Sequence, residues 1–339
     1  MSYSTTLYFL LLMANTSYHV SAVYEDDSRR YCRLCQRHTM CLFPFDDPSH
    51  RCQDLECGDL DHSEIQSIVH EHNLHRNHIA SGQETRGKPG PQPPARSMME
   101  LCWDEELAAL ARKWVLQCVP FRKDECRDVG KFSVWQNIHV WPMDVVETST
   151  SSHHRIPFHI QSWLDDVENF DTAEVGMVDF SREDRGGYIG IATGMITRVG
   201  CGRALYSVEM GYQHHQGMGN SLSPMVNGLE MQGVNNNSTA PSANVHSTDT
   251  GNRLEVLVCN YGPIDRTTPG NLYEDGMPSS CPMGFQTSPR YENLCSATEE
   301  QDDEHWEPSV RSASMGQHCA TYLLLFALHR SLVDLLSER

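Results

Sequence analysis

The residue types best suited to chemistry stand close together in the segment HEHNLHRNH, from His70 to His78. A zinc-protease helix reads H-E-x-x-H, in which two histidines one helical turn apart bind zinc and the glutamate activates a water molecule. His70 and Glu71 open this pattern, but Leu74 stands where the second histidine is needed. His75 comes one residue later and faces away from His70 on a helix. The spacing therefore disfavours a zinc site of this kind.

The segment belongs to a predicted helix over residues 61–80, whose buried face has helical spacing and consists of Ile65, Ile68, Val69, His72, Arg76 and Ile79. We expect His72 and Arg76 to find hydrogen-bond partners on that face, because buried polar groups require them. A second helix is predicted from Asp104, which serves as N-cap, and a third over residues 158–170. The proline-rich residues 85–95 are predicted to form an extended connector.

Strand-like patterns follow the helices, over residues 188–202 and 254–262. Between them, residues 209–252 are rich in Gly, Ser, Asn, Met and His without periodicity, which predicts a disordered insertion in a hairpin loop. Overlapping sequons at Asn236 and Asn237 are candidate glycosylation sites in that loop. Helices that cover both faces of a sheet predict an α+β layered domain.

The composition excludes one class of partner. The chain has 339 residues and a formal net charge of -19, and no basic stripe stands out along it. Binding to a phosphate backbone depends on such a basic stripe. We therefore expect no nucleic-acid partner.

The N-terminus predicts secretion. An apolar run over residues 7–14 is too short to span a bilayer and is followed by Val20-Ser21-Ala22, a small-residue cleavage pattern. A signal peptide over residues 1–22 is the preferred interpretation, and a buried N-terminal strand is the alternative. The thirteen cysteines agree with secretion, where such density indicates disulfide bonds. CRLC, at 32–35, has the spacing of a zinc knuckle or redox motif, but no second C-x-x-C pair follows.

The C-terminal residues 299–339 combine an acidic linker with an apolar or amphipathic tail. The apolar core of the tail is too short to span a membrane, whereas leucines at helical spacing indicate an amphipathic helix that packs on protein or lipid. A GPI-anchor signal is the alternative, with Ser312, Ala313 and Ser314 as the small residues. Membrane association through this tail is therefore an open expectation.

Several further segments carry a family resemblance. They are EHNLHR, ETRGKPGPQPPA, LCWDEELAALARKWVLQC, CRDVGKFSVWQNI, RVGCG and VCNYGP, in this order. The chain resembles the CAP superfamily, which covers cysteine-rich secretory, antigen five and plant pathogenesis-related proteins. The arm pattern YCRLCQRHTMCLFP is similar to that of the insect antigen five, or venom-allergen-like, branch. The resemblance covers roughly residues 31–295, apart from the insertion.

This resemblance implies a three-layer α-β-α sandwich with a disulfide-rich N-terminal arm. The predicted organisation is a signal peptide over 1–22, an arm over 23–60, a CAP domain over 61–270, a small disulfide loop over 271–298 and the tail over 299–339. The short EHNLHR segment is then the signature of the first CAP helix, and its likeness to a zinc-protease helix is a coincidence.

The resemblance also implies a cleft in which two histidines and two acids bind a metal. By position, the first histidine falls on Lys123 and the second on Gly187, while the acids fall on Gln136 and Asp166. Trp135 replaces a usual glycine at the cleft wall. Zinc prefers imidazole, thiolate or carboxylate ligands, and this set offers one carboxylate. We therefore expect a degenerate cleft, no bound metal or cofactor, and no catalytic residue.

A disulfide framework is implied by the same resemblance: Cys32–Cys41, Cys35–Cys126, Cys201–Cys259, and Cys118 joined to either Cys52 or Cys57. Cys281 and Cys295 bracket a small loop and are expected to pair with each other. Cys102 is expected to be a buried free thiol inside the second helix, since cysteine packs as a small hydrophobe.

Three classes of function follow from these observations. The preferred one is a secreted, non-enzymatic protein that binds a small apolar ligand, such as a lipid or sterol, or a secreted or receptor protein. A metal-dependent or serine-type hydrolase is one alternative, although no G-x-S-x-G elbow is present. The other is a GPI-anchored or membrane-associated surface protein.

Overall fold

The computed structural model describes residues 29–43, 47–143, 155–184, 186–208 and 253–297. The predicted signal peptide, the insertion with Asn236 and Asn237, and the C-terminal tail lie outside these residues. Within them, no helix is long and apolar enough to cross a membrane.

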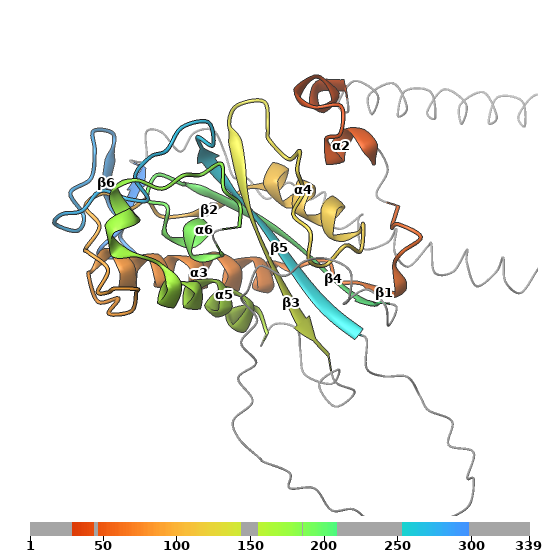
Figure 1. The fold of residues 1–339 in the computed structure, drawn as a ribbon, viewed down its shortest axis with the longest axis horizontal. Helices are drawn as coiled ribbons and strands as arrows, with labels where there is room; N and C mark the ends of the chain where they lie inside the picture. Colours follow the sequence, from red (N-terminus) through yellow and green to blue (C-terminus); the bar gives the residue numbers. More distant parts are fainter. Residues whose placement is uncertain (1–28, 44–46, 144–154, 185, 209–252, 298–339) are drawn as a thin grey trace, which may run out of the picture.

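One sheet forms the centre of the fold (Figure 1). Its four main strands are antiparallel in the order β1-β4-β5-β3, and the short β2 pairs with β4 in parallel. The bounds are β1 Gln53–Cys57, β2 Cys102–Trp103, β3 Ser133–Pro142, β4 Arg198–Ser207 and β5 Arg253–Ile264. A separate two-stranded sheet joins β6 Phe285–Thr287 to β7 Cys295–Ala297.

Helices cover both faces of the central sheet. On one face lie α3 (His62–Ala80), α5 (Ile156–Asp165) and α6 (Tyr188–Ala192), and α4 (Glu105–Val115) lies on the other. Side chains of β5 alternate between the two faces of the sheet. Leu257 and Tyr261 belong to the hydrophobic core under α3, α5 and α6, whereas Val256 and Val258 belong to the core under α4. The predicted α+β three-layer sandwich is therefore confirmed. The N-terminal arm adds α2 (Thr39–Leu42) beside α4.

The first two helix predictions agree with the structure at their starts. Asp61 caps α3 in a capping box with Glu64, and the side chain of Asp104 caps α4 by accepting from the backbone N–H of Leu107. The third helix begins earlier than expected, at Ile156, and after Asp165 it continues only as the 3-10 turn η3 (Asp166–Asn169).

The strand prediction over residues 188–202 is wrong in its first half. Residues Tyr188–Ala192 form α6, and the strand begins at Arg198. All five α6 residues are buried, so a short run that is apolar all round fits a buried helix as well as a buried strand. The sequence prediction also missed β1 and β3.

A buried arginine connects the helical layer to the loops beside the sheet. Arg76 of α3 is fully buried, and in the described part of the chain no carboxylate pairs with it. Its guanidinium instead donates hydrogen bonds of 2.7–3.2 Å to backbone carbonyl oxygens of Met99, Ile191, Thr193, Gly194 and Ile196. Burial lowers the pKa of Arg76 to about 9. This one side chain fixes the end of α6 and the segments that precede β2 and β4.

Two neighbours of Arg76 on the same helix have similar roles. The ring of His72 donates from Nδ1 to the carbonyl of Ile68, at 2.7 Å, and Nε2 accepts from the Tyr261 hydroxyl, at 2.8 Å. Burial lowers the pKa of His72 to about 3, so this ring stays neutral. The amide of Asn73 makes paired hydrogen bonds with the backbone of Leu101. The expectation that His72 and Arg76 find partners on the buried face is confirmed.

The glycines of RVGCG let α4 lie directly against β4. A Cβ atom on Gly200 would come within 2.2 Å of the backbone nitrogen of Ala108, and one on Gly202 within 2.4 Å of the Cα of Arg112. Cys201, between them, points to the opposite face and bonds to Cys259, which stands directly opposite it on β5.

We predict that Arg76→Lys lowers the free energy of unfolding by at least about 3 kcal/mol, because each buried carbonyl left without a donor costs roughly 1–3 kcal/mol. Denaturant unfolding measures this change. Arg122→Lys is the control, since the exposed Arg122 pairs with Glu125 at the surface, and it should change stability by less than about 0.5 kcal/mol. Equal losses in the two variants would contradict the role given to Arg76.

Candidate functional site

The histidines of the opening segment do not converge on one point. The exposed His70 bonds through Nδ1 to the hydroxyl of Tyr291, at 2.9 Å, whereas His72 is bonded inside the core. The half-buried His75 has a pKa lowered to about 4 by burial. Among the described residues, no group of three or more His, Cys, Asp or Glu side chains is arranged to hold a metal ion.

Gln136, at the first acid position of the cleft, is a buried structural amide. Its Oε1 accepts from the backbone N–H of Asp124, at 2.8 Å, and its Nε2 donates to Oδ1 of Asn260, at 2.9 Å. Asn260 in turn donates to the carbonyl of Leu107, at the start of α4. Both ends of the Gln136 amide are therefore used to join β3, β5 and α4 to the loop that precedes β3.

Lys123 places an ammonium group at the first histidine position. Its Nζ donates to the carbonyl of Glu183, at 2.7 Å, and lies 4.7 Å from the centre of the Trp135 ring. Burial and the nearby Arg127 lower the pKa of Lys123 to about 8, while the carboxylates of Glu183 and Asp166 act in the opposite direction. The bulky Trp135 is thus the surface on which this cation packs.

Asp166 and Gly187 are bonded to each other. The Asp166 carboxylate accepts from the backbone N–H of Gly187, and the carbonyl of Gly187 accepts from Nδ2 of Asn137, at 2.8 Å. Burial raises the pKa of Asp166, and its bond to Gly187 opposes this rise. A Cβ atom on Gly187 would lie 2.5 Å from Cβ and Cδ1 of Trp163. A histidine at this position would therefore require Trp163 to move.

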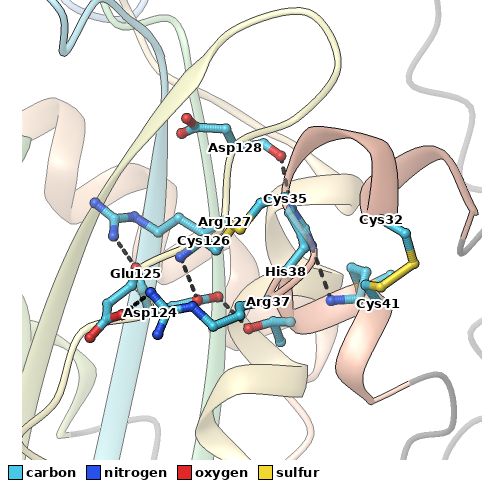
Figure 2. The surroundings of a disulfide bond; sticks show 12 residues. Cys32, Cys35, Arg37, His38, Cys41, Asp124, Glu125, Cys126, Arg127 and Asp128 are labelled. Carbon is cyan, nitrogen blue, oxygen red and sulfur yellow. Dashed lines mark hydrogen bonds and ion pairs between the residues drawn. A yellow bond between two sulfur atoms is a disulfide. The ribbon is translucent and has the colours of Figure 1, made fainter.

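The N-terminal arm holds the loop that carries Lys123. Figure 2 shows the Cys35–Cys126 disulfide, with the ring of His38 bonded to the backbone of Asp128. The hydroxyl of Thr39 donates to the carboxylate of the buried Asp124, at 2.5 Å, and that carboxylate also accepts from the N–H of Cys126. The arm and the cleft thus share one network through Asp124.

The disulfides of the described chain are the pairs that the resemblance implies, together with the expected pair that closes the small C-terminal loop. They are Cys32–Cys41, Cys35–Cys126, Cys52–Cys118, Cys201–Cys259 and Cys281–Cys295. Of the two partners left open for Cys118, the structure selects Cys52. The expectation for Cys102 is wrong in two respects, because this residue begins β2 and its side chain is exposed.

These four cleft positions do not fit a divalent cation. Lys123 brings a positive charge, both ends of the Gln136 amide are hydrogen-bonded within the fold, and Gly187 has no side chain. Only Asp166 offers a donor that zinc prefers, and it already accepts the Gly187 N–H. Structural and catalytic zinc sites need three or four protein ligands. The residues at these positions instead make hydrogen bonds within the fold: Asp166 bonds to Gly187, Lys123 to the carbonyl of Glu183, and Gln136 to Asp124 and Asn260.

Comparison with known proteins defines the class of protein. The model of the CAP family, described as the cysteine-rich secretory protein family, matches residues 69–217. Venom allergen 3 of Solenopsis invicta is 35% identical over 255 residues, which cover 72% of this chain and 88% of that protein. Venom allergen 5.01 of Dolichovespula maculata is 34% identical over 193 residues, or 56% of this chain and 82% of that protein.

Solved structures are also similar to this chain at low sequence identity. That of Na-ASP-1 has a TM-score of 0.48 and 19% identity, covering 74% of this chain and 50% of that one. That of BmVAL-1 has a TM-score of 0.47 and 18% identity, and the match covers 72% of this chain and 99% of that one.

The sequence relatives show the family: this chain belongs to the CAP family of cysteine-rich secretory proteins. Within it, the relatives named above are insect venom allergens, as the arm pattern indicated.

We predict that Gly187→Ala lowers the free energy of unfolding by about 1–3 kcal/mol, the usual cost of overpacking a filled core. The new methyl group would collide with Trp163. Gly176→Ala is the matched control, because a Cβ atom there meets no other atom within 4 Å. Denaturant unfolding of both variants compares them, and a Gly187→Ala protein as stable as the control would show that the position has room for a side chain.

The lowered pKa of Lys123 predicts a pH dependence of stability. The pKa is about 8 in the folded protein and 10.5 when the lysine is solvated, so between these values the unfolded chain binds more protons. The contribution of Lys123 to the free energy of unfolding therefore rises from pH 8 to pH 10. Lys123→Met should abolish this rise, whereas Lys131→Met, at an exposed lysine, should retain it. Urea titrations at several pH values test this, and parallel curves for wild type and Lys123→Met would contradict it.

Proposed function

We propose that this CAP protein is a secreted, non-enzymatic binding protein with a degenerate cleft. The observation that carries the proposal is the internal bonding of all four cleft positions. Lys123 is bonded to the carbonyl of Glu183, Gln136 to Asp124 and Asn260, and Asp166 to Gly187. General acid-base catalysis needs a titrating group within reach of a substrate. Of the two titratable side chains at these positions, Lys123 is bonded to the carbonyl of Glu183 and Asp166 to the N–H of Gly187, which favours a structural role for both.

Secretion is supported by the disulfides and by the family. Five disulfides within the described residues are typical of an oxidising compartment, where thiols are not kept reduced. The matching family is that of the cysteine-rich secretory proteins, and the relatives named above are venom allergens. An extracellular location is therefore part of the proposal.

The ligand is proposed to be a small apolar molecule or a protein partner. An open surface pocket of about 620 Å³ lies between residues 93–96, 172–176 and 271–275. Val175 and the buried Tyr273 contribute apolar surface, while Arg96, Glu274 and Asp275 add charges at its edge. Of the two proposed ligands, these charged lining residues favour the protein partner.

Zinc calorimetry on purified, tag-free protein tests the degenerate cleft. Any uptake by the eighteen histidines should be weak, without defined stoichiometry, and unchanged in Asp166→Ala. Asp165→Ala removes the adjacent carboxylate and is the matched control. Tight binding of one zinc ion, lost in Asp166→Ala but kept in Asp165→Ala, would overturn the proposal and favour a metal-dependent hydrolase.

Identification of what copurifies with the native protein tests the binding role. Lipid extraction with mass spectrometry detects a lipid or sterol, and crosslinking detects a protein partner. Arg96→Glu should weaken capture of a partner that uses the pocket edge, whereas Arg122→Glu, at a distant exposed arginine, should not. Hydrolytic turnover of ester or peptide substrates by the purified chain would contradict a non-enzymatic role.

A further inference from the structure

A second polar cluster, at the other end of the sheet from the cleft, has no assigned role. At its centre is Glu255 of β5, which is fully buried. Its Oε2 accepts from Nε of the buried Arg155, at the start of α5. Beside it, Arg203 of β4 donates to both carboxylate oxygens of Glu64, at the start of α3. Two carboxylates and two guanidinium groups are thus enclosed between α3, α5 and the sheet.

Two buried nitrogen atoms of this cluster lie near the same carboxylate oxygen without bonding to it. The three atoms are Oε1 of Glu255, Nε2 of His159 and Nε of Arg203, all buried and without a hydrogen-bond partner in the structure. Oε1 of Glu255 lies 3.9 Å from Nε2 of His159 and 3.9 Å from Nε of Arg203. These separations are too long for direct hydrogen bonds.

The other bonds of these side chains explain why the three atoms remain. The remaining ring nitrogen of His159, Nδ1, is taken by Nδ1 of His139, at 2.8 Å. The terminal nitrogens of Arg203 are taken by Glu64, and Oε2 of Glu255 is taken by Arg155. Each residue therefore has one buried polar atom without a partner, and both nitrogen atoms lie 3.9 Å from Oε1 of Glu255. A buried polar atom left unpaired costs roughly 1–3 kcal/mol.

The charges around these three atoms determine what can bind there. Glu64 and Glu255 balance Arg155 and Arg203, and burial together with these arginines keeps the pKa of His159 well below its usual range, so its ring is neutral. A bound cation would face the N–H of Arg203, and a bound anion would face the carboxylate of Glu255. A neutral molecule that both donates and accepts hydrogen bonds satisfies all three atoms, with His159 in either tautomer.

We propose that Glu255, His159 and Arg203 form a binding site for one buried water molecule. Internal waters typically make about three hydrogen bonds to polar groups that would otherwise be unpaired, and these three atoms provide that number. The water accepts from Nε of Arg203, donates to Oε1 of Glu255 and bonds to Nε2 of His159. It thereby links α5, β4 and β5 to one another. The direct bonds of the cluster, by contrast, only join Arg203 to α3 and Glu255 to the start of α5.

This site is separate from the cleft and from the proposed binding function. Along β3, Gln136 of the cleft pairs with Asn260 of β5, and Trp141 pairs with Glu255. Five residues of strand separate the two positions, which corresponds to about 17 Å. Failure of one proposal therefore leaves the other intact.

A high-resolution crystal structure of the native chain tests the proposal directly. Density for one ordered water should lie within about 3.2 Å of all three atoms. Direct contact between Glu255 and His159 or Arg203, with no density between them, would overturn the proposal, as would an empty space.

A pair of variants tests the same site in solution by oxygen-17 relaxation, which counts long-lived internal waters. Both His159→Phe and His139→Phe break the bond between the two rings, but only His159→Phe removes one of the three water partners. We expect one long-lived water fewer in His159→Phe and an unchanged number in His139→Phe. An unchanged number in both variants would contradict the site, and if His159→Phe does not fold, the native crystal structure decides.

Discussion

The fold depends on a buried guanidinium group that no carboxylate of the described residues pairs with. Burying an unpaired charge is costly, so the five carbonyl oxygens around Arg76 must remain within reach of its nitrogens. Two of them belong to Ile191 of α6 and to Thr193 directly after it, and α6 begins one residue after Gly187. The position of the cleft wall therefore follows from a hydrogen-bond network that begins on α3.

The other polar residues that resemble catalytic groups are likewise hydrogen-bonded within the fold. His72 is a neutral ring held between Ile68 and Tyr261, and Gln136 joins three elements through its amide. Lys123 has its charge stabilised by an aromatic face and one carbonyl. In each case the residue type suits chemistry, but the side chain makes its hydrogen bonds within the fold. Within the described residues, the chain keeps the CAP framework without a cluster of three or more His, Cys, Asp or Glu side chains that could hold a metal ion.

Sequence patterns that extend over many residues predicted the fold well, whereas short apolar runs did not. The spacing in residues 61–80 located α3 and its buried face, because nineteen residues give several helical turns of evidence. Residues 188–192 offered one apolar run, which does not distinguish a strand from the buried helix α6. The cleft positions followed from the resemblance, but no spacing reveals that Trp163 occupies the side-chain space at Gly187. The Glu255 site joins residues from α5, β4 and β5, so only the tertiary structure brings them together.

We propose that the cleft residues serve the fold and bind no metal. Anomalous diffraction at the zinc absorption edge, from native crystals grown with excess zinc, tests it most directly. The account predicts no anomalous peak within bonding distance of Asp166, and unchanged hydrogen bonds at Lys123, Gln136 and Gly187. A fully occupied zinc ion about 2.0–2.2 Å from an Asp166 oxygen, with further protein ligands around it, would contradict the account.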